Sequence, residues 1–108
     1  MKQRPEPLPA TDASASLQAL AEAFAGLDRA QDVLAFLRDL CTPAELEAMS
    51  DRWRVVPLLL QGTPYREIHD RTLVSVTTIG RVARTLEHGE GGYHAAVERQ
   101  HPHLAPNH

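Results

Sequence analysis

The chain has 108 residues, 43% of them hydrophobic and 23% charged, which is enough apolar material for one small folded domain. Only 5% are aromatic, so the core must be built from Leu, Val, Ala and Ile. No apolar run approaches the ~20 residues of a membrane-spanning helix, and residues 1–16 lack the apolar stretch of a secretory signal. We therefore expect no membrane partner.

The net charge of −3 is unevenly distributed. Residues 1–51 carry four Lys/Arg and nine Asp/Glu, a balance of −5, whereas residues 52–108 carry seven and five, a balance of +2. Phosphate binding depends on the local field more than on the total charge. A nucleic-acid interface is therefore expected in the second half of the chain.

The N-terminal part predicts a disordered arm followed by two helices. Residues 1–15 are rich in Pro, Ser and Thr and have few large apolar groups. Two apolar stripes at helical spacing follow, made of Leu17, Leu20, Phe24 and Leu27, and of Val33, Leu34, Leu37 and Leu40. Asp28 is the predicted N-cap of the second helix. Phe36 lies off its stripe, which fits either an interlocked dimer or an ordinary buried helix.

The clearest helix start is at Thr42 and Pro43, where Glu45 completes a capping box. The stripe that follows is Leu46, Met49, Trp53, Val56 and Leu60, and Gly62 is a C-terminal stop. Pro57 removes one hydrogen bond inside this helix, so we expect a kink there or two helices in close succession.

Residues 63–87 predict a helix-turn-helix. Thr63 and Pro64 open a short helix with Ile68 as its buried anchor, residues 72–75 form the turn, and Ser75 caps the second helix. The inward side of that helix is predicted to hold Val76, Ile79, Ala83 and Leu86, and its outward side Thr77, Arg81, Arg84 and His88. The second helix of such a pair lies in the DNA major groove.

The remaining segments predict little chemistry. Residues 93–100 favour a last short helix, residues 101–108 a disordered tail, and residues 16–100 a single all-α domain of about six helices. Cys41 is the only cysteine, which fits a core residue in a reducing cytoplasm. The six histidines have no convincing ligand spacing, and no catalytic constellation stands out, so we expect neither a metal site nor an enzyme.

Three segments carry a family resemblance: LRDLCTPAELEAMSDRWRV, LLLQGTPYREIHDRT and TTIGRVARTLEHGEGGY. They are similar to the tryptophan repressor family, above all to its uncharacterised branch, over roughly residues 33–99. The resemblance implies an all-helical, intertwined homodimer that presents two reading heads to successive major grooves. The turn departs from the family, because Leu73 and Val74 stand where members carry small residues such as Gly-Ala.

The resemblance also implies a co-repressor site at Thr42, Arg52 and Arg81. In tryptophan-responsive members a glycine follows the last of these positions, where this chain has Val82, so tryptophan is not the expected ligand and no cofactor is required. A salt bridge of Arg52 to Asp51, to Glu45 or to a partner subunit is the competing interpretation.

The predicted DNA-binding residues are Arg66, Ser75, Thr77, Thr78, Arg81, Arg84 and His88. Thr77 and Thr78 either reach phosphates or base edges or only cap the start of the helix. Arg81 and Arg84 either bind guanine or phosphates or form a solvated charged face. Arg66 contacts a phosphate or pairs with a nearby carboxylate. His88 is expected at the surface.

The sequence thus predicts a cytoplasmic, nucleoid-associated transcriptional regulator that acts as a repressor. Its expected partners are double-stranded DNA and a second copy of itself. The alternative is a helical protein-interaction module of the same fold that does not bind DNA, which the acidic total charge and the unusual turn favour.

Overall fold

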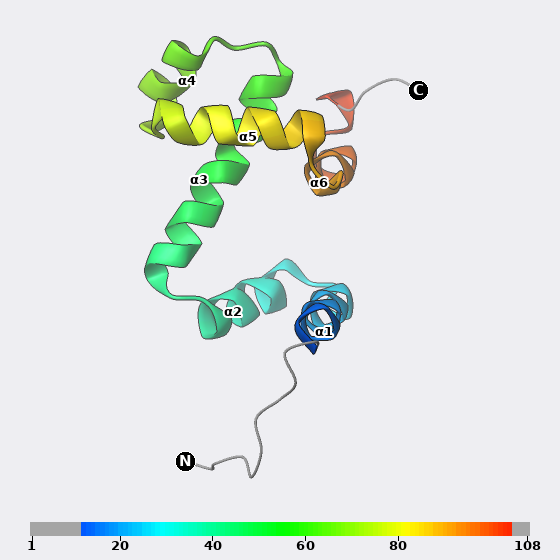
Figure 1. Cartoon of the computed structure of the whole chain (residues 1–108). Helices are drawn as coiled ribbons and strands as arrows, with labels where there is room; N and C mark the ends of the chain where they lie inside the picture. The colour runs from blue at the N-terminus through cyan, green and yellow to red at the C-terminus, as the bar shows by residue number, and fades with distance from the viewer. Residues whose placement is uncertain (1–11, 105–108) are drawn as a thin grey trace. The chain divides into compact units, whose positions relative to one another are not determined.

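The computed structural model describes residues 12–104, in which all regular structure is helical (Figure 1). This confirms the predicted all-α fold with about six helices. The elements are α1 (Ala13–Ala25), α2 (Ala30–Leu40), α3 (Pro43–Leu60), α4 (Tyr65–Thr72), α5 (Val76–His88), α6 (Gly92–Gln100) and the short 3₁₀ helix η2 (Pro102–Leu104).

Parts of both ends that were predicted to be disordered are helical in the structure. Helix α1 begins at Ala13, so residues 13–15 of the predicted arm are helical, while residues 1–11 lie outside the described residues. Within the predicted tail 101–108, residues 102–104 form η2, and residues 105–108 lie outside the described part. Residues 13–15 include two alanines, and alanine is the strongest helix former, which favours the earlier start.

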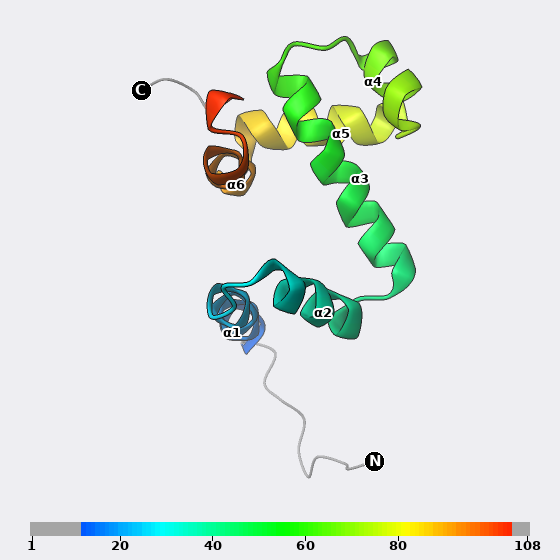
Figure 2. The ribbon, with the colours of Figure 1, turned by 180° about the vertical axis from the view of Figure 1, so that it is seen from behind.

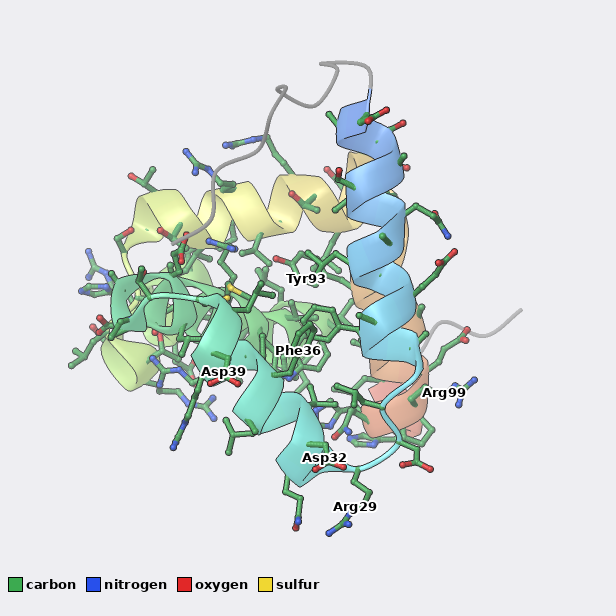
Figure 3. All side chains as sticks on the ribbon, turned by 90° about the horizontal axis from the view of Figure 1, so that it is seen from below. Arg29, Asp32, Phe36, Asp39, Tyr93 and Arg99 are labelled. Atoms are coloured by element: carbon green, nitrogen blue, oxygen red, sulfur yellow. The ribbon has the colours of Figure 1, made fainter. Side chains whose placement is uncertain are left out.

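The chain divides into two compact units, with the boundary between Thr42 and Pro43, inside the domain predicted over 16–100. The first described unit is the pair α1 and α2. Phe36 on α2, labelled in Figure 3, meets Phe24 of α1 edge to face, with ring centroids 5.0 Å apart. The residue predicted to lie off the stripe therefore joins the two helices. The N-cap of α2 is Arg29 with an extended backbone, not the predicted Asp28.

The second unit opens with the long helix α3, which begins at Pro43 as predicted and runs through Pro57 as one helix. The alternative of two successive helices is therefore wrong. Gly62 ends the segment in the left-handed conformation, with φ of 80°, as its predicted role requires. Its amide and that of Thr63 donate to the carbonyls of Leu59 and Leu58, both at 3.0 Å, which satisfies two carbonyls at the helix end.

The core of the second unit lies where α3, α4 and α5 meet. Helix α5 crosses α3, with α4 near its first end and α6 near its last, in both views of the ribbon (Figures 1 and 2). The buried side chains are Val55, Val56, Ile68, Val74, Ile79, Val82 and Val97. All are aliphatic, as the scarcity of aromatic residues predicts.

Helix α6 packs on the rest of the second unit through the buried Val97, a ring contact and a side-chain hydrogen bond. Tyr93 stacks on the half-buried Trp53, with centroids 6.5 Å apart. The Nε2–H of His94 donates to the carbonyl of Leu86 at 2.9 Å, a group in the last turn of α5 that lacks a partner within its own helix. Within residues 12–104, no helix is both long and apolar enough to cross a membrane.

Candidate nucleic-acid interface

The predicted helix-turn-helix is present in the second unit as α4, a three-residue turn and α5. Helix α4 starts one residue later than predicted, because Pro64 rather than Thr63 is its N-cap and makes no side-chain cap. Ile68 is fully buried and anchors α4 to the core, as predicted. The short helix is thus held by packing more than by its ends.

The turn keeps a left-handed residue although the sequence offers no glycine there. Leu73 has φ of 65° and ψ of 8°, and its amide donates to the carbonyl of His69 at 2.7 Å. Its side chain is 82% exposed. The turn is therefore not rebuilt around the missing glycine: the leucine takes the conformation that glycine would take, at a cost of about 1–2 kcal/mol.

Replacing Leu73 with glycine is expected to stabilise the protein by up to about 1 kcal/mol, since it relieves this backbone strain and removes almost no buried surface. Urea unfolding at one fixed protein concentration measures the change. Leu73→Ala is the matched control, because it removes the side chain and keeps the Cβ strain. A glycine variant no more stable than the alanine variant would contradict this account of the turn.

A set of side-chain hydrogen bonds compensates for the strained turn. The hydroxyl of Thr72 donates to the carbonyl of Ile68 at 2.7 Å and accepts from the amide of Val74 at 3.1 Å. The Nδ1–H of His69 donates to the carbonyl of Val74 at 2.8 Å. Because Val74 is itself buried, these bonds fix the path by which the chain enters α5.

Arg54 ties this turn to the long helix. Its guanidinium donates to the carbonyl of Thr72 at 3.0 Å and pairs with Asp51 at 3.1 Å. Asp51 was one of the salt-bridge partners suggested for Arg52, but in the structure Asp51 pairs with Arg54. An arginine at the end of α4 also suits the partial negative charge of a helix C-terminus.

Helix α5 begins with the cap that the sequence predicts. The hydroxyl oxygen of Ser75 accepts the amide of Thr78 at 3.1 Å, and the Ser75 hydroxyl donates to the Thr78 hydroxyl at the same distance. Ser75 is therefore a capping residue in this structure. Thr78 is half-buried beside it, whereas the side chain of Thr77 is exposed and makes no hydrogen bond within residues 12–104.

The inward side of α5 differs from the prediction at two positions. Ile79 is buried as predicted, and Leu86 packs partly buried against the core. Val76, predicted inward, is 53% exposed, whereas Val82 is buried instead. The prediction for Val76 is wrong because a helical period does not show where a core ends, and the first residue of α5 lies beyond that end.

The outward side of α5 carries arginines without acidic partners. Arg81 and Arg84 are exposed, and neither joins an ion pair within residues 12–104. The same holds for Arg66 on α4, because Glu67 pairs with Arg71 instead, at 3.3 Å. The predicted solvated face is therefore positively charged, and its cations are available to an outside ligand.

Two other features shape this face. His88 is exposed at the end of α5, 3.8 Å from the carboxylate of Glu87. Gly80 leaves a gap in the side-chain cover of α5: a Cβ there would lie 3.8 Å from Nη1 of Arg84 and 3.9 Å from the ring of Tyr65. Such distances are ordinary contacts, so nothing within the chain requires a glycine at this position.

The three residues predicted to bind a co-repressor are divided between the units. Thr42 ends the first unit, whereas the half-buried Arg52 and the exposed Arg81 belong to the second. A pocket of about 360 Å³ is lined by none of them; its walls are Thr85, Gly89, Glu90, Gly92 and Tyr93. The buried Val82 lies in the core.

The contacts of Arg54 and His69 with the turn escaped the sequence analysis. Arg54 contacts a carbonyl 18 residues away, which no local spacing indicates. The contact of His69 with Val74 depends on the left-handed residue between them, and that conformation is not expected of leucine.

Comparison with known proteins agrees with this geometry. The family model described as Trp repressor protein matches residues 15–101, which is most of the chain. The chain belongs to the Trp repressor family. It is 32% identical over 83 residues to the uncharacterized protein YerC of Bacillus subtilis (strain 168), covering 77% of this chain and 80% of that one. The predicted resemblance, including that to the uncharacterised branch, is confirmed.

Two solved structures of Trp repressor-like proteins share the fold. A candidate Trp repressor from Staphylococcus aureus is 31% identical with a TM-score of 0.76, covering 86% of this chain and 91% of that one. A TrpR-like protein from Eubacterium eligens ATCC 27750 is 27% identical with the same TM-score, covering 92% and 100%. The fold is therefore that of Trp repressor-like proteins.

Proposed function

We propose that this protein is a sequence-specific transcriptional regulator, a repressor, that reads the DNA major groove with α5. The observation that carries the proposal is that Arg81 and Arg84 lie exposed on one face of a capped helix and join no ion pair within residues 12–104. An α-helix with its side chains is about 10–12 Å across and the major groove about 12 Å wide, so such a helix fits it. Arg66 on the preceding helix is placed to contact a phosphate.

We propose that the reader is a homodimer. In the described chain, α1 and α2 contain no buried residue, and Leu17, Leu34 and Leu40 are between 47% and 67% exposed. Apolar side chains in such number favour a partner surface. A second copy of the chain supplies an equally apolar one. Operator half-sites about 10 bp apart, or a multiple, follow from such a dimer.

We propose further that the regulator needs no small molecule and is not a tryptophan sensor. The support is Val82, whose side chain is buried among the core aliphatics at the position where tryptophan-responsive members have glycine. The protein acts in the cytoplasm, on the nucleoid, where its DNA target lies. No catalytic role is assigned to any residue.

The experiment begins with recovery of bound fragments from the source genome, sequenced and searched for a two-fold-symmetric site. Affinity for the recovered duplex is then measured between 50 and 200 mM salt. One to three arginines per subunit on phosphates give a loss of about 10–10³-fold over this range. The control is a duplex of the same length and scrambled sequence, which should bind more weakly throughout.

The same titration separates the two candidate functions. A helical protein-interaction module, favoured by the acidic first half of the chain, would show no useful DNA affinity even at 50 mM salt. Figure 3 shows two acidic residues of this first half of the chain, Asp32 and Asp39, on α2. That outcome would replace the proposed function with the interaction module.

A further inference from the structure

Val76 is an exposed apolar side chain at the start of α5. It is the first residue of α5, directly after the cap Ser75, and just over half of its surface is open. The next residue, Thr77, is an exposed hydroxyl. The buried residues of α5 are Ile79 and Val82, and Val76 is not among them. Val76 therefore lies outside the buried core, with much of its side chain open to a ligand.

We propose that Val76 contacts the C5-methyl group of a thymine and thereby selects thymine at one position of each half-site. This inference rests on the proposed DNA-binding function. The first residues of a reading helix reach base edges. Thymine alone presents an apolar group in the major groove, and every other base edge there offers hydrogen-bond donors or acceptors that a valine cannot use.

The charges around Val76 favour DNA over a protein as its partner. Arg81 and Arg84 are exposed on the same helix, Arg66 is exposed on α4, and none of the three has an acidic partner in the described part of the chain. A protein surface that covered Val76 would also have to neutralise these cations. DNA does both, since its phosphates pair with arginines while a thymine methyl meets the valine.

The test is a two-by-two comparison on the recovered duplex. Each thymine is replaced in turn, symmetrically in both half-sites, by deoxyuridine, which lacks only the methyl group. At one position the wild-type protein should lose about 4-fold in affinity per half-site, the equivalent of one buried methyl. Val76→Ala should bind thymine and uracil at that position equally well.

Two controls complete the design. Leu73→Ala removes another exposed apolar side chain, one that precedes α5, and should keep the full thymine preference. Urea unfolding of Val76→Ala should match the wild type, because the valine lies outside the core.

Each result has one meaning. If no uracil position weakens wild-type binding, or if Val76→Ala remains as sensitive as the wild type, the inference is overturned while DNA binding stands. If the wild-type protein binds no thymine-containing duplex at low salt, the proposed function itself fails, and the inference fails with it.

Discussion

Arg84→Ala is expected to weaken binding to the recovered duplex by about 1–3 kcal/mol per half-site, a loss of roughly 5- to 150-fold. The guanidinium is exposed, joins no ion pair within residues 12–104, and lies over the open backbone at Gly80. An arginine in that position is free to fork onto the acceptor atoms of a guanine. Losing a base contact lowers the affinity for the recovered duplex and leaves the affinity for a scrambled duplex unchanged.

The measurement is therefore a ratio, the affinity for the recovered duplex divided by that for the scrambled one. Arg84→Ala should lower this ratio. Arg99→Ala is the control for charge alone, since Arg99 is an exposed arginine on α6, remote in sequence from the reading helix. It should lower both affinities by similar factors or neither. If Arg84→Ala also lowers both equally, Arg84 touches only phosphate.

Ile68→Ala should reduce the free energy of unfolding by about 2–5 kcal/mol. Ile68 is fully buried, and it is the only residue of α4 that enters the core with α3 and α5. Removing it leaves a cavity under the helix-turn-helix. The free energy of unfolding of native proteins is only about 5–15 kcal/mol, so this substitution removes a large part of it.

Unfolding in urea, followed by helical circular dichroism at one protein concentration, tests this expectation. Ile68→Val is the graded control and should cost about 0.5–1.5 kcal/mol. DNA binding of Ile68→Ala should fall only as far as the folded fraction falls. A loss below about 1 kcal/mol would show that α4 is not held by this side chain.

Local signals in the sequence predicted the elements well. The start of α3 at Pro43, the stop at Gly62 and the cap at Ser75 each depend on residues within one turn of the chain. Such features follow from backbone chemistry alone. The burial of Ile68 and Ile79 was predicted from helical spacing, which is also a local pattern of the sequence.

Features that depend on tertiary packing were missed or predicted wrongly. Period alone cannot show where a core ends, so Val76 was predicted inward. The cap predicted at Asp28 is displaced to Arg29, because a capping residue type does not fix the backbone conformation of its position. The left-handed Leu73 lies in a turn supported by bonds that no local pattern shows, such as that of Arg54 to the carbonyl of Thr72.

The candidate site was predictable in its residue types more than in its contacts. Arg81 and Arg84 were placed on the outward face by spacing, and the structure exposes both. The ion pairs could not be known from the sequence: Arg66 had acidic residues near it in the chain, but Glu67 pairs with Arg71 instead. Side-chain competition of this kind is decided only in three dimensions.

Methylation of guanine N7 by dimethyl sulfate, with and without saturating protein, tests most directly whether α5 occupies the major groove. The N7 atom lies in that groove, so a helix seated there shields it. The account predicts two blocks of protected guanines, one per half-site, about 10 bp apart or a multiple of that spacing. A fully bound duplex whose guanines are all methylated at the rate of free DNA would contradict it.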